Sequence, residues 1–117
     1  MTVLVPISVS KAGRADLDAV LVAATTAGDS VDAASGLLVV MKNADSSTHT
    51  LTVAAPVASA RAANFGALPV AALSLVVLTN DVGLLTIPPG YANASGDFVW
   101  TYDDDTSVTI GVFSLAP

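Results

Sequence analysis

Short apolar runs rich in Val, Ile and Thr alternate with Gly, Pro, Asn and Asp along most of the chain. Branched side chains suit a pleated, half-buried strand, whereas the turn-forming residues interrupt one. The pattern predicts an all-β fold, a single antiparallel β-sandwich or jelly-roll-like domain of about eight strands. The expected strands cover residues 2–8, 19–25, 37–42, 48–54, 73–79, 83–87, 98–102 and 107–115.

The connections between these strands carry turn-forming residues. We expect residues 80–83 to form a hairpin loop with Gly83 in the left-handed conformation, and residues 103–106 to close a second hairpin. Pro88 and Pro89 end a strand, because proline cannot donate to a β-ladder. These turns suit an antiparallel order of strands.

Two segments allow a helix. Leu17, Leu21 and Ala24 fall at helical spacing, yet Val20 and Val22 with the following Thr pair favour a strand over residues 19–25. The Ala-rich connection at residues 54–72 is hard to assign, and a short helix over residues 57–63 is an alternative there. We take the strand as the prediction for the first segment and leave the second open.

Two of the expected strands are apolar on both faces. In residues 48–53, Thr alternates with apolar residues and His49, which is typical of a strand with one face in water. Residues 37–41 and 75–78 instead lack a polar face, although each strand of an antiparallel sandwich normally has one. Their outer faces therefore need a cover, from the connection at residues 54–72 or from a partner.

Composition narrows the possible functions. The 117 residues are 53% hydrophobic and 12% charged, with one His and no Cys. Disulfide scaffolds, thiolate zinc sites, Cys nucleophiles and His-pair metal sites are excluded by this inventory. We therefore expect a protein that is not an enzyme and that needs no metal or other cofactor.

Charge argues against two classes of partner. The formal net charge is −6, and residues 62–117 contain five Asp and no base. Because phosphates require clustered Lys or Arg, we expect no nucleic-acid partner, and an anionic membrane surface would repel the chain. The longest uncharged stretch, residues 62–80, contains polar residues, Gly and Pro, so it is not a membrane span. Lys11 and Arg14 follow the apolar residues 3–7, an order unlike that of a secretion signal.

Acidic and aromatic side chains suggest candidate sites that each have a structural alternative. Asp103, Asp104 and Asp105 are hard ligands for Ca²⁺, but adjacent residues of an extended chain point in alternate directions, which favours a solvated turn. His49 is a candidate base, and its apolar neighbours favour a packing role. Trp100 is a candidate sugar platform or part of the core, and we favour the core.

The chain resembles the small all-β capsid decoration, or cement, proteins of tailed bacteriophages. The matching features are a run from Val39 to Asp45, the Thr-rich strand at residues 48–53 that ends at Pro56, the strand end at residues 87–89, and the last strand at residues 108–112. The similarity extends over about residues 28–115, and residues 54–72 depart from it.

This resemblance implies a β-sandwich that binds the outer surface of the phage head and stabilises the assembled shell. The implied partner is the major capsid protein, and the implied location is the virion, after synthesis in the cytoplasm of the bacterial host. We also expect a homo-oligomer, for which a trimer is one form. The alternatives are a self-assembling fibre or surface-layer subunit, and a carbohydrate-binding module that uses Trp100, Tyr102 and Tyr91.

The N-terminal segment is the candidate interface. Residues 1–8 form either an arm that adds as a strand to a capsid subunit or a neighbouring copy, or the first strand of the domain at residues 9–117. The candidate interface residues are Thr2, Val3, Leu4, Val5 and Ile7.

Overall fold

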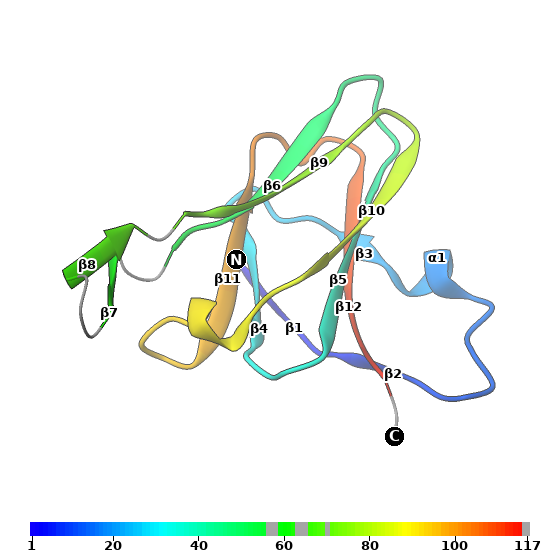
Figure 1. Cartoon of the computed structure of the whole chain (residues 1–117). Helices are drawn as coiled ribbons and strands as arrows, with labels where there is room; N and C mark the ends of the chain where they lie inside the picture. Colours follow the sequence, from blue (N-terminus) through cyan, green and yellow to red (C-terminus); the bar gives the residue numbers. More distant parts are fainter. Residues whose placement is uncertain (56–58, 63–65, 70, 116–117) are drawn as a thin grey trace.

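The computed structural model describes residues 1–55, 59–62, 66–69 and 71–115. These residues form two facing five-stranded sheets, which confirms the predicted all-β, sandwich-like domain (Figure 1). Both sheets are mixed rather than purely antiparallel, because each one contains a parallel strand from the N-terminal segment.

Sheet 1 contains the N-terminal strand at one edge and β9 at the other. Its order is β1 (Thr2–Leu4), β4 (Asp29–Asp32), β11 (Asp97–Tyr102), β6 (His49–Val53) and β9 (Leu73–Val77). The pairing of β1 with β4 is parallel, and the other three pairings are antiparallel.

Sheet 2 is built around the two longest strands of the described chain. Its order is β10 (Asp81–Thr86), β5 (Leu37–Asn43), β12 (Val108–Leu115) and β2 (Ile7–Val9), with β3 (Val22–Ala23) beside the other end of β12. Only the β12–β2 pairing in this sheet is parallel.

Four further elements of the described residues lie outside the two sheets. β7 (Ser59–Ala62) and β8 (Gly66–Pro69) pair antiparallel as a hairpin beyond the ends of β6 and β9 (Figure 1). The helix considered for residues 57–63 is therefore wrong over residues 59–62, and residues 57, 58 and 63 lie outside the described residues. The helical elements are the one-turn α1 (Leu17–Val20) and the 3-10 turn η1 (Pro89–Tyr91).

The core lies between the sheets and is filled by the inward side of each long strand. Trp100 and Phe98 of β11 and Met41 of β5 are its largest fully buried side chains. Their alternation with more exposed residues follows the two-residue period of a strand. The core assignment of Trp100 is confirmed.

The expected hairpins at residues 80–83 and 103–106 are wrong, because each connection crosses between the sheets. The first joins β9 of sheet 1 to β10 of sheet 2, and the second joins β11 to β12. Asn80, with φ of 57°, takes the left-handed position expected for Gly83. Gly83 lies inside β10, where an added Cβ would approach the Val77 side chain to 2.7 Å.

The strand predicted over residues 19–25 is largely replaced by α1 and the short β3. The helical spacing of Leu17 and Leu21 prevails because this segment packs over the outer face of sheet 2. One Leu21 methyl lies 2.7 Å from the position that a Cβ on Gly111 of β12 would take. An ion pair of 2.9 Å between Lys42 of β5 and Asp18 also joins α1 to the sheet.

Candidate functional site

The N-terminal segment forms part of both sheets of its own chain. Leu4 of β1 is buried in the core, and Val5 and Pro6 carry the chain from sheet 1 to sheet 2, where Ile7 begins β2. Val3 and Val5 are 67% and 80% exposed. The segment is thus a pair of edge strands that presents apolar side chains to solvent, and Thr2 lies exposed at its start.

A buried carboxylate anchors the start of this segment. Asp29 of β4 is 0% exposed, and its Oδ1 accepts a hydrogen bond of 3.3 Å from the Thr2 backbone N–H. Its Oδ2 accepts hydrogen bonds from the Thr25 backbone N–H at 3.2 Å and from the Tyr102 hydroxyl at 2.6 Å. The Trp100 Nε1–H donates to that hydroxyl at 2.8 Å. The network links the N-terminal segment to the largest side chain of the core.

Burial raises the pKa of Tyr102, and the nearby Asp29 carboxylate raises it further. The phenol therefore keeps its proton and remains a hydrogen-bond donor to Asp29. Trp100 is 1% exposed, so it cannot serve as a sugar-binding platform in this structure.

An apolar groove of about 360 Å³ lies beside the N-terminal segment. β12 pairs with β3 through Thr109 and Ile110 and with β2 from Phe113 onward, so Gly111 and Val112 lie between the two short strands. The walls of the groove include Val3, Val5, Ile7, Val20, Val22 and Val112. All five predicted interface residues, Thr2, Val3, Leu4, Val5 and Ile7, line this groove.

A second exposed apolar surface lies where the two sheets are joined. Val76 and Leu78, at the end of β9, are 58% and 59% exposed, and Val82 and Leu84 of β10 are 53% and 57% exposed. We call these four residues the β9–β10 set. Among the described residues, β9 pairs only with β6 and β10 only with β5, so both are edge strands.

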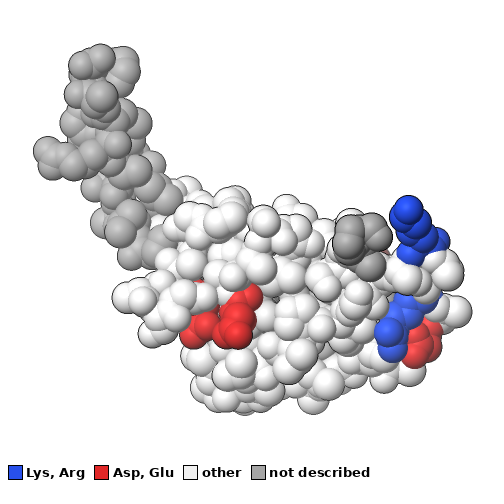
Figure 2. All heavy atoms as spheres, turned by 90° about the horizontal axis from the view of Figure 1, so that it is seen from below, with Lys and Arg blue, Asp and Glu red and all other residues white. Residues whose placement is uncertain are grey.

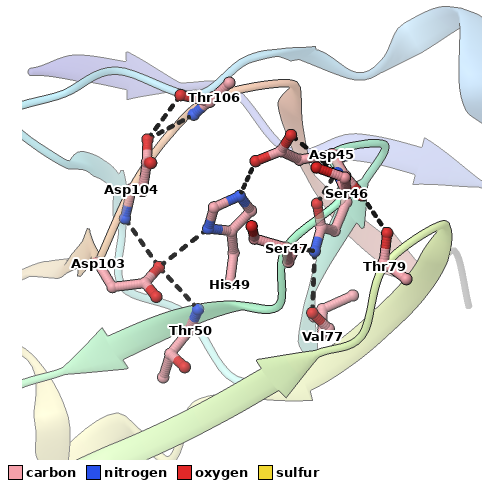
Figure 3. A network of polar contacts seen from close by, with 11 residues as sticks. Asp45, Ser46, Ser47, His49, Thr50, Val77, Thr79, Asp103, Asp104 and Thr106 are labelled. Atoms are coloured by element: carbon pink, nitrogen blue, oxygen red, sulfur yellow. Dashed lines mark hydrogen bonds and ion pairs between the residues drawn. The ribbon is translucent and has the colours of Figure 1, made fainter.

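A polar cluster holds together three connections at one end of the sandwich (Figure 3). His49 is 2% exposed, and its Nε2 lies 2.8 Å from Oδ2 of Asp45. Its Nδ1 is 3.5 Å from Oδ1 of Asp103 and has no hydrogen-bond partner among the described residues. The buried Asn43 donates to the backbone oxygens of Ser47 and Val77, at 2.7 and 3.0 Å.

The charges of this cluster stabilise the protonated histidine. The hydrogen bond to Asp45 raises the pKa of His49, against the opposing effect of burial, and Asp103 and Asp104 raise it further. The same bond lowers the pKa of Asp45. Because the ring is almost fully enclosed, it presents no open face to a substrate, which favours the packing role over the base.

The carboxylates of residues 103–105 are used within the protein. Asp103 Oδ1 accepts the Thr50 backbone N–H at 2.9 Å, and Asp104 Oδ1 accepts both the N–H and the hydroxyl of Thr106. Hydrogen bonds from Thr106 lower the pKa of Asp104. Within the described ranges, no group of three or more acidic, His or Cys side chains is arranged to hold a metal ion.

Sequence reasoning missed the two buried polar anchors. Asp29 lies in a segment outside the predicted strands, and Asn43 lies just beyond the strand predicted over residues 37–42. The signal for Asn43 was its spacing from Asp45, because its Oδ1 accepts the Asp45 N–H at 3.0 Å in an Asx turn. Two of the three partners of Asp29, Thr2 and Tyr102, are distant in sequence, and its spacing from Thr25 alone does not mark it as buried.

No protein-family model matches the chain, and neither a curated protein nor a solved structure is significantly similar to it. None of the helices in the described ranges has the length and apolar character needed to cross a membrane.

Proposed function

We propose that this chain is a capsid decoration protein, a non-catalytic subunit that binds the outer surface of an assembled phage head. Its partner is the major capsid protein. The proposal rests on the sequence resemblance and on one structural observation, the set of large apolar side chains at the sheet edges.

The apolar edges favour a role in assembly. Nine Val and Leu side chains of the described residues are at least 40% exposed, and six of them belong to the N-terminal segment or the β9–β10 set. The face in Figure 2 is largely uncharged, with the basic side chains gathered at one end. Sets of exposed Val and Leu side chains at sheet edges favour a protein interface at those edges.

The proposed mechanism is preferential binding to the assembled lattice. A subunit that contacts two neighbouring capsid proteins binds the shell and not the separated subunits, which stabilises the assembled state by linkage. Many copies, each held by a small apolar contact, then act together. The N-terminal residues Val3 and Val5 supply this contact, since their side chains point outward while Leu4 holds β1 in place.

Co-sedimentation tests the proposal directly. Purified protein is mixed with empty phage capsids, before and after expansion, and the bound fraction is measured across a concentration series. We expect saturable binding at a fixed number of copies per capsid subunit. Absence of saturable binding to either form would overturn the proposed function.

A pair of substitutions tests the proposed contact without removing β1 or β2. Val3→Ser combined with Val5→Ser changes two exposed side chains, so the fold should remain and capsid affinity should fall by about tenfold or more. Leu17→Ser, at a position that is 40% exposed and lies outside the groove beside the N-terminal segment, is the matched control and should bind normally. Equal binding by the double variant and the control would exclude this surface as the contact.

A further inference from the structure

We propose that two copies of this chain exchange residues 1–9, so that β1 and β2 of each copy complete the two sheets of the other. Residues 1–9 of one copy then pair with β4 and β12 of a second copy of the same chain. This inference is independent of the proposed function, since the exchange requires no capsid.

The positions that receive the segment are already defined within one chain. β1 pairs with β4 through Thr2 with Asp29, Val3 with Ser30, and Leu4 with Val31. β2 pairs with β12 through Ile7 with Phe113, Ser8 with Ser114, and Val9 with Leu115. A second copy supplies the same side chains to the same positions, so exchange preserves these pairings and the contacts of Asp29.

The segment is attached to the rest of the chain by an exposed connection. Each residue from Ser10 to Ala19 is exposed, and α1 contains no buried residue. In Figure 1 the chain after β2 runs well away from the sandwich before it returns at α1. Extending residues 10–16 therefore exposes little additional surface. Seven extended residues span roughly 23 Å, which is the distance that the hinge can bridge between the two copies.

The closed form of this connection contains a turn that requires a left-handed residue at position 13. The Gly13 N–H donates to the Ser10 carbonyl at 2.9 Å, and Gly13 has φ of +80°. Glycine adopts this left-handed conformation readily, whereas a branched residue does not. The turn is absent when the hinge is extended. A substitution at residue 13 that disfavours the turn therefore shifts the equilibrium from the closed monomer to the exchanged dimer.

Complementary cysteine variants detect the exchange, because the natural chain has no Cys. Ser8 and Ser114 are register partners on adjacent strands, and the spacing of about 5 Å between paired strands suits a disulfide. Ser8→Cys and Ser114→Cys chains of different tag length are unfolded together, refolded at low and high concentration, and oxidised. We expect a mixed disulfide-linked dimer whose yield rises with protein concentration.

Each single variant refolded and oxidised alone is the control for random collision. An exchanged dimer of one variant places its thiol beside serine, so a cross-link should be rare. A mixed-dimer yield no greater than that of the single variants, with both chains folded by circular dichroism, would overturn the proposal. A wild-type chain that remains monomeric by light scattering at every accessible concentration would also overturn it.

A hinge substitution separates exchange from other self-association. Gly13→Val strains the closed turn and should raise the dimer-to-monomer equilibrium constant by roughly tenfold or more. Gly36→Val is the matched control, since Gly36 has φ of +78°, also has open space around its Cα, and lies outside the hinge. It should destabilise the fold without raising the dimer fraction. Equal dimer fractions in the two variants would exclude residues 10–16 as the hinge.

Discussion

β5 and β9 share an apolar pattern on both faces, but only β5 is covered on its outer face by its own chain. Val40 of β5 is 7% exposed, whereas Val76 and Leu78 at the end of β9 are more than half exposed. β5 lies between β10 and β12, and Leu21 packs beside it over Gly111. β9 is an edge strand.

The contrast shows that an apolar outer face has two possible explanations. For β5 the segment that contains α1 supplies cover, whereas the sequence pointed to the connection at residues 54–72 or to a partner. For β9 the outer face remains available to another molecule. Position in the sheet, not the pattern of the strand, decides between these outcomes.

The largest expected effect comes from making the two outer faces polar. Val40→Ser removes buried apolar surface and places a hydroxyl under the cover, so we expect a loss of about 2–3 kcal/mol in the free energy of unfolding. Val76→Ser should change it by less than about 0.5 kcal/mol, because the side chain is already in water. Denaturant unfolding measures both. Similar losses would show that β9 is also covered.

Removing the cover itself should have a smaller effect. Leu21→Ala takes away the side chain over Gly111 and should cost about 1–2 kcal/mol, since Leu21 is only partly buried. Binding of a hydrophobic dye should rise as the outer face of β5 opens. Leu17→Ala is the control, because Leu17 is 40% exposed and should matter less. An unchanged unfolding midpoint for Leu21→Ala would show that Leu21 does not cover the outer face of β5.

The smallest expected effect concerns the cluster that holds the start of β6 and, through it, β9. His49 has a folded-state pKa raised above its ordinary value of 6.5 by the bond to Asp45. Its stabilisation is therefore fully present below about pH 6.5 and is lost as pH rises through the folded-state pKa.

His49→Asn should remove this dependence. Thermal unfolding at low salt between pH 5.5 and about 9 should show a decline in the midpoint for the wild type and a flatter profile for the variant. The carboxylates of Asp45, Asp103 and Asp104 face the ring, and the lowered pKa of Asp45 and of Asp104 keeps them ionised throughout this range. If the unfolding midpoint declined with pH equally in the wild type and in His49→Asn, the titration of the His49 ring would not be coupled to folding.

The existence of most long strands was predictable because branched apolar residues and turn residues act locally. β5, β6, β9, β11 and β12 lie within a residue or two of their predicted ranges. The core position of Trp100 followed from the same two-residue period. These features need no information about distant parts of the chain.

The sheet to which each strand belongs was not predictable from its turns. Asn80 lies in the turn after β9, and this turn places β10 in the opposite sheet, where Gly83 allows close approach to Val77. β4 was missed because its Asp29 becomes buried only through hydrogen bonds to Thr2, Thr25 and Tyr102. Of these partners, Thr2 and Tyr102 are brought to Asp29 by the fold rather than by sequence spacing.

The candidate interface was partly predictable. Its exposed apolar residues, Val3 and Val5, follow from the run at the start of the sequence, and so does the interruption at Pro6. That run does not show that β1 and β2 join different sheets, because their places depend on pairing with β4 and β12.

The parallel pairing of β2 with β12 has a consequence for synthesis on the ribosome. Ile7 of β2 pairs with Phe113 of β12. About 100 further residues are therefore translated after β2 before its neighbouring strand β12 is present. During that delay β1 can already pair with β4, but β2 of the nascent chain has no neighbouring strand of its own. A second copy that has already been translated through β12 supplies the missing neighbour, so the order of synthesis favours the proposed exchange over closure within one chain.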